Sequence, residues 1–220
     1  MKANFNPEAG EERAETATAF LEQQKLVDLA QLMGGGNDQR IIALFGEIGT
    51  EAAYNVWSGV LKMQYEDENS PITIIMSSPG GDVTSAFSIW DALTLTPCPI
   101  IMVGVGEIMS AGAFLMYAGT PGKRYLAPNT IVMAHQISYG DMGRMSAMKS
   151  KLIATEKMQE RFLSLMADRA NLKGTFISKR KRLEKYWLGE TDSYFFANEA
   201  IEILGLADKI GLPYLNNAGE

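Results

Sequence analysis

Short apolar runs alternate with stretches of helical periodicity, and this alternation constrains the fold more than any other feature of the chain. Three of the runs have the length of strands: Arg40–Gly46, Pro71–Ser77 and Pro99–Val105. Between them, apolar residues recur at the three- and four-residue spacing of helices that bury one face. Strands that alternate with helices in this way predict βαβ units around a largely parallel sheet. The expected fold class is therefore α/β.

The 220 residues are enough for one domain with a sizeable core. We interpret residues 1–38 as an N-terminal extension that contains a helix and ends in a glycine run, and residues 39–220 as the main domain. In that domain we also expect short strands within Lys123–Ala127 and Thr130–Gln136, and a long amphipathic helix over Ser146–Ala170.

Charge and cysteine content exclude several classes of function. The net charge of −6 argues against sequence-independent binding of nucleic acid, so we interpret the basic run Lys179–Arg182 as a solvated helix face. The single cysteine, Cys98, excludes an internal disulfide, and with one histidine in the chain it excludes the usual zinc sites. No apolar run has the length of a membrane span, and the first residues have no secretory signal. We expect a cytoplasmic protein that binds neither metal nor membrane.

Two loops follow strands at the edge of the sheet where α/β proteins place their chemistry. In the first, Ser77–Val83, two glycines allow backbone amides to point into a cleft. The second carries Ser110 at a strand-to-helix turn among small residues, which makes Ser110 a candidate nucleophile. The amides of Gly81 and Ala111 would then form an oxyanion hole. A serine at this place is also a common helix cap, and Ile108 stands where the α/β-hydrolase motif has glycine.

A serine hydroxyl is a weak nucleophile and needs a base. The only imidazole of the chain, His135, follows an apolar strand and so emerges at a loop. A third group has to orient that imidazole, and the residues leave three candidates: Asp141, Glu190 and Asp192. Apolar side chains near the serine suggest a pocket for hydrophobic side chains of a substrate. Its candidate members are Ile108, Met109, Phe114 and Met133.

Three stretches carry a specific resemblance: SPGGDVTSAFSIWDAL, GVGEIMSAGAFLMYAGTPGKRYLAPNTIVMAHQ and EAIEILGLADKI. Together they closely resemble the proteolytic subunit of the Clp protease (ClpP). The resemblance implies the ClpP/crotonase-like superhelix of βαβ units with a protruding helix-strand handle. Carried over by position, it implies Ser110 as nucleophile, His135 as general base and Asp192 as the third member, since Asp192 precedes an aromatic step and an A-x-E-A helix start. The oxyanion donors fall on the backbone of Gly81 and Ala111.

The resemblance also implies a function: hydrolysis of peptide bonds of proteins inside a self-compartmentalised assembly of heptameric rings, stacked as a tetradecamer. It implies an AAA+ unfoldase as a partner and no metal or organic cofactor. Two residues depart from the family pattern, Ala111 where methionine is usual and Ser193 where arginine is frequent, so the chain is interpreted as a divergent or phage-encoded member. Two alternatives remain: a crotonase-type enzyme that acts on acyl-coenzyme A, and a non-catalytic ring subunit.

Overall fold

The computed structural model describes residues 40–138 and 144–213, so the extension proposed for residues 1–38 lies outside the described residues. The strands are β1 Ile41–Phe45, β2 Ile72–Ser78, β3 Ile100–Met109, β4 Arg124–Leu126, β5 Ile131–Ala134, β6 Ser193–Phe196 and β7 Lys209–Ile210. The helices are α2 Thr50–Glu66, α3 Val83–Leu95, α4 Ala111–Met116, α5 Met145–Arg169, α6 Phe176–Trp187 and α7 Ala197–Glu199, followed by the π-helical turn η1 Ala200–Leu204. The α/β class predicted from the sequence is confirmed.

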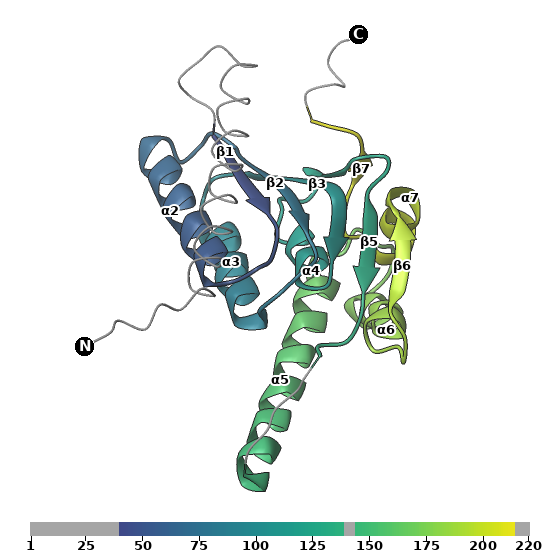
Figure 1. The fold of residues 1–220 in the computed structure, drawn as a ribbon. Helices are drawn as coiled ribbons and strands as arrows, with labels where there is room; N and C mark the ends of the chain where they lie inside the picture. Colours follow the sequence, from purple (N-terminus) through teal and green to yellow (C-terminus); the bar gives the residue numbers. More distant parts are fainter. Residues whose placement is uncertain (1–39, 139–143, 214–220) are drawn as a thin grey trace, which may run out of the picture.

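The described strands form one sheet, in which β3 connects two parts. Strands β1, β2, β3, β4 and β7 are neighbours in this order and run parallel, while β5 also pairs with β3 and carries β6 on its other side. The first half of β3, Met102–Gly104, pairs with β4, and the second half, Glu107–Met109, pairs with β5. Because β2, β3 and β5 are parallel, their carboxyl ends lie at the same edge of the sheet (Figure 1).

Aromatic side chains from four helices form the centre of the core. Phe114 of α4 stacks on Trp90 of α3 and on Phe162 of α5, with ring centroids 4.5 and 3.8 Å apart. Phe162 also meets Trp187 of α6 edge to face. All four side chains are at most 4% exposed. Because α4 begins directly after Ser110, this stack fixes the helix that follows the candidate nucleophile.

Helix α5 extends well beyond the rest of the domain (Figure 1). The helix predicted over Ser146–Ala170 is confirmed with bounds shifted by one residue, Met145–Arg169. Its buried residues lie in the C-terminal part, from Phe162 onward, and its N-terminal part exposes apolar side chains. Of the helices that the structure describes, α5 included, none combines the length and the apolar character that crossing a bilayer requires.

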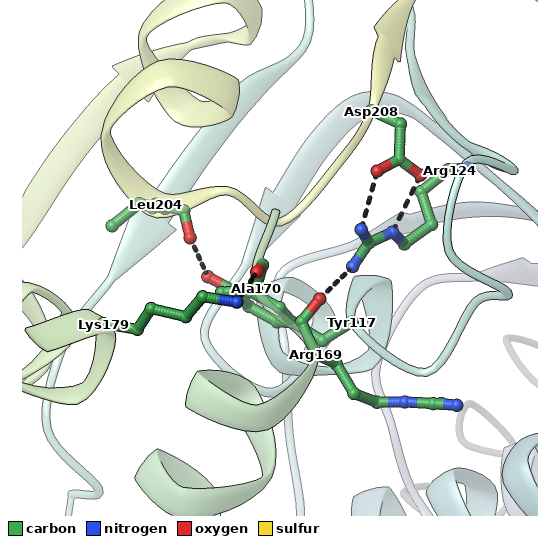
Figure 2. Close-up of polar contacts among 7 residues, drawn as sticks. All are labelled: Tyr117, Arg124, Arg169, Ala170, Lys179, Leu204 and Asp208. Carbon is green, nitrogen blue, oxygen red and sulfur yellow. Dashed lines mark hydrogen bonds and ion pairs between the residues drawn. The ribbon is translucent and has the colours of Figure 1, made fainter. Parts of the chain in front are cut away.

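The C-terminal end of α5 is held by two cations (Figure 2). Arg124 donates to the carbonyl of Arg169 at 2.7 Å, and Lys179 Nζ donates to the carbonyl of Ala170 at 2.8 Å. Arg124 also pairs with Asp208, and both side chains are buried. Carbonyls at the end of a helix have no intrahelical partner, and cations there also interact favourably with the helix dipole. The helix is therefore anchored at this end.

The interpretation of the basic run as a solvated helix face is wrong for two of its residues. Lys179 caps α5, as described above. Arg180 forms ion pairs with Glu160 of α5 and Glu184 of α6, and its side chain is 24% exposed. The positive charges of α6 therefore join this helix to α5.

Candidate active site

Ser110 lies at a strained turn between β3 and α4. It has φ of 52° and ψ of −120°, and it is the one non-glycine residue with positive φ in the described part of the chain. A non-glycine residue in this backbone conformation destabilises the fold by about 1–3 kcal/mol, and it persists only where contacts with the surrounding structure hold it. Two hydrogen bonds do so: Ser110 N donates to Met133 O at 2.9 Å, and Phe114 N donates to Ser110 O at 3.1 Å.

The glycine loop after β2 packs directly against this turn. A Cβ atom on Gly80 would lie 2.7 Å from Ser110 Cβ and 3.2 Å from the amide nitrogen of Ala111, so this position admits only glycine. Its φ of 104° favours glycine for a second reason. The sequence indicated the conformational freedom of both glycines and an oxyanion role for Gly81, but not the packing of Gly80 against Ser110.

Gly81 forms a parallel bridge with Ile48. In this bridge Ile48 N donates to Gly80 O and Asp82 N donates to Ile48 O, both at 2.7 Å, so the amide of Gly81 itself is not used. The amide of Ala111, at the first position of α4, has no partner within the helix. Neither amide donates a hydrogen bond to another described residue. Both amides are therefore hydrogen-bond donors that the described residues leave unused.

Asp82 closes the glycine loop by capping α3. Its carboxylate accepts hydrogen bonds from Ser85 N at 2.7 Å and Thr84 Oγ1 at 2.6 Å. Burial alone would raise the pKa of Asp82, but these hydrogen bonds outweigh it, and the pKa lies below its usual range. A charged cap of this kind holds the loop at the start of α3.

The structure brings His135 to Ser110, with 2.7 Å between His135 Nε2 and Ser110 Oγ. The contact follows from the sheet, because β3 and β5 pair in parallel with Met109 opposite Met133. Ser110 follows the end of β3 and His135 follows the end of β5, so both residues lie at the same edge of the sheet. The histidine side chain is 22% exposed. A hydroxyl and an imidazole at this distance are arranged for proton transfer.

Of the three carboxylates considered as the third group, the structure places Asp192 at the histidine. Strands β5 and β6 are antiparallel with Ala134 opposite Ser193, so His135 and Asp192 follow as neighbours. His135 Nδ1 and Asp192 Oδ1 are 3.8 Å apart, and the aspartate side chain is 51% exposed. Glu190 makes no ion pair or hydrogen bond within the described residues, and Asp141 lies outside them.

The predicted apolar pocket is wrong for two of its four members. Ile108 and Phe114 are completely buried in the core, and Phe114 belongs to the aromatic stack. Met133 is 9% exposed, which leaves Met109 as the partly exposed apolar side chain of this set beside the serine.

Comparison with known proteins shows which family the chain resembles. The model of the Clp protease family matches residues 23–213. The chain is 31% identical over 172 residues to the ATP-dependent Clp protease proteolytic subunit 2 of Corynebacterium efficiens, which covers 78% of this chain and 82% of that protein. It is 30% identical over 171 residues to the ATP-dependent Clp protease proteolytic subunit 1 of Leifsonia xyli subsp. xyli, with the same two shares.

The matches confirm the resemblance drawn from the three sequence stretches, and they favour a peptidase over an enzyme of acyl-coenzyme A. The matched region includes the glycine loop, Ser110, His135 and Asp192. The chain therefore belongs to the Clp protease family of peptidases.

Proposed function

We propose that the chain is a serine endopeptidase in which Ser110 is the nucleophile, His135 the general base and Asp192 the residue that orients the histidine. The observation that carries this proposal is the distance of 2.7 Å between His135 Nε2 and Ser110 Oγ. The strained backbone of Ser110 supports it, because strain of this kind collects at functional sites.

In the proposed reaction, His135 Nε2 takes the proton of Ser110 Oγ as that oxygen attacks the carbonyl carbon of a peptide bond. The tetrahedral oxyanion is bound by the amides of Gly81 and Ala111, which have no other partner among the described residues. The imidazolium then gives its proton to the leaving amine, and an acyl-enzyme remains. Water, activated by the same histidine, hydrolyses this ester and restores the serine.

Asp192 supports the imidazolium by its charge and not by a direct hydrogen bond, because 3.8 Å is beyond hydrogen-bond distance. A negative charge at this distance still attracts the imidazolium that forms during the reaction. Since the carboxylate is half exposed, solvent weakens this effect.

The active unit is an assembly of this chain in heptameric rings, stacked in pairs and supplied with protein substrates by an AAA+ ATPase. The names of the relatives, proteolytic subunits of an ATP-dependent Clp protease, support this part of the proposal. The N-terminal part of α5 also supports it, because several apolar side chains there suit burial against another copy. The exposed residues are Met145, Met148, Leu152 and Ile153.

Substitution of Ser110 tests the proposal. Ser110→Ala should lower the hydrolysis of an unstructured peptide by about 10⁴-fold or more and abolish labelling by a fluorophosphonate probe, while native mass measurement shows the same assembly. The control is Ser58→Ala, which changes an exposed serine of α2 and should leave both peptide hydrolysis and labelling as in wild type. Labelling that persists in Ser110→Ala contradicts the assignment of the nucleophile. Absence of labelling in the assembled wild type favours the non-catalytic ring subunit.

A further inference from the structure

Gln159 lies on α5 at the point where this helix leaves the body of the domain. Its Oε1 accepts a hydrogen bond from the backbone N–H of Ile137 at 2.7 Å. Ile137 follows His135 by two residues, beyond the end of β5 at Ala134, where the ladder of the sheet no longer holds the chain. Among the described residues, this is the hydrogen bond that joins α5 to the segment after the histidine.

The other amide atom of Gln159 is also informative. Gln159 Nε2 is buried and finds no hydrogen-bond partner among the described residues. A buried polar group without a partner costs about 1–3 kcal/mol. A methionine or leucine would avoid that cost at this position, so the glutamine is useful for its acceptor atom, Oε1.

The same helix also contacts the nucleophile's side of the site. Phe162 follows Gln159 by three residues, so the two side chains lie on one face of α5. Phe162 stacks on Phe114 at 3.8 Å, and Phe114 belongs to the helix that begins directly after Ser110. One turn of α5 therefore contacts both arms of the site: the helix after the serine and the segment after the histidine.

From these contacts we infer that Gln159 is a positioning residue, which sets the place of the His135 imidazole relative to Ser110. This inference rests on the proposed serine-peptidase function. The aromatic stack fixes α5 against the serine side, and the Gln159–Ile137 hydrogen bond transfers that fixed position to the chain that carries the histidine. Proton transfer depends steeply on the separation of the two atoms, and a small displacement is enough to slow catalysis.

Two substitutions of equal side-chain length test the inference. Gln159→Met removes the acceptor and should lower kcat about tenfold with KM within twofold of wild type. Gln159→Glu keeps an acceptor for Ile137 N–H and should retain most of the activity. Lys157→Met, an exposed neighbour on α5, is the matched control and should have no effect.

A spectroscopic measurement separates positioning from a loss of stability. His135 is the only histidine of the chain, so isotope-labelled histidine gives the imidazole signals of the site alone. In Gln159→Met these signals should shift and broaden at a temperature where the protein is folded, whereas in Gln159→Glu they should stay sharp. Unchanged kcat and imidazole signals in Gln159→Met overturn the inference, as does a loss in Gln159→Glu as large as that in Gln159→Met.

If Gln159→Met does not fold, Gln159→Asn replaces it, because an amide shorter by one methylene does not reach Ile137 N–H and should behave as Gln159→Met is expected to. The imidazole signals do not depend on turnover. A failure of the proposed function, seen as full activity in Ser110→Ala, is therefore distinguishable from a failure of the positioning role.

Discussion

Asp208 and Asp192 each lie beside a side chain that carries nitrogen donors. Asp208 pairs with Arg124 inside the protein, and Asp192 lies near His135 at the surface. Asp208 binds Arg124 through both carboxylate oxygens, with Arg124 Nη2 and Asp208 Oδ1 2.6 Å apart and side chains 1% and 7% exposed (Figure 2). Asp192 approaches His135 Nδ1 only to 3.8 Å, and half of its side chain is in solvent.

The difference between the pairs follows from what each nitrogen has to do. Arg124 keeps its charge, and its donors are occupied by Asp208 and by the carbonyl of Arg169, so the pair holds β4, β7 and the end of α5 in one arrangement. His135 gains and loses a proton in every proposed cycle, so Asp192 acts on a reacting group and does not hold elements of the fold together. The comparison predicts that Asp208 serves stability and Asp192 serves activity.

Removal of the charge of Asp208 should have the largest effect. Asp208→Asn leaves the Arg124 guanidinium buried without its counter-charge, and breaking a buried pair in this way costs about 3–5 kcal/mol. We expect a loss of this size in the free energy of unfolding, measured in urea. The control is Asp168→Asn, an exposed aspartate near the same end of α5, which should stay within about 0.5 kcal/mol of wild type. A loss below 1 kcal/mol in Asp208→Asn would contradict the structural role.

Removal of the charge of Asp192 should leave stability unchanged and lower activity. We expect Asp192→Asn to reduce kcat by about 10²-fold, less than the roughly 10⁴-fold found where the equivalent aspartate is buried and directly bonded. The neighbouring Glu190→Gln, also exposed and without a partner among the described residues, should stay within twofold of wild type. A loss near 10⁴-fold would show that the pair closes to a direct hydrogen bond during catalysis. Activity within threefold would remove Asp192 from the mechanism.

The sequence predicted β1 to β5 and the long helices, because local periodicity determines them, but it did not predict β6 and β7. Strand β1 lies within Arg40–Gly46, and β2 extends one residue beyond Pro71–Ser77. Strand β3 begins within Pro99–Val105 but extends to Met109, and the long helix differs by one residue at each end. The place of the serine and the histidine at one edge of the sheet also follows from local pattern, because parallel strands share their carboxyl edge.

Contacts between distant segments were not predictable in the same way. The residues alone left Asp141, Glu190 and Asp192 open, because the choice depends on the register of β5 against β6, about sixty residues apart. An apolar side chain after the serine, such as Phe114, suits a pocket and a core equally well, and only packing decides between them. The caps of α5 by Arg124 and Lys179 depend on where the end of one helix lies against another.

The third prediction, with the smallest expected effect, concerns the free energy of unfolding at acid pH. Burial alone would raise the pKa of Asp208, but the hydrogen bonds and charge of Arg124 outweigh it, and the pKa lies below its usual range. In a pH range below about 4, the unfolded chain therefore binds a proton that the folded chain does not. The stability from this pair is present above the ordinary carboxyl pKa and is lost as the pH falls through the lowered one.

We expect a steeper fall of the free energy of unfolding on acidification in wild type than in Asp208→Asn. The difference in slope should persist in 0.5 M salt, because salt screens a buried pair much less than a surface pair. Parallel curves for the two proteins would show that Asp208 is not held in its charged form by Arg124, and the contrast with Asp192 would then be one of burial alone.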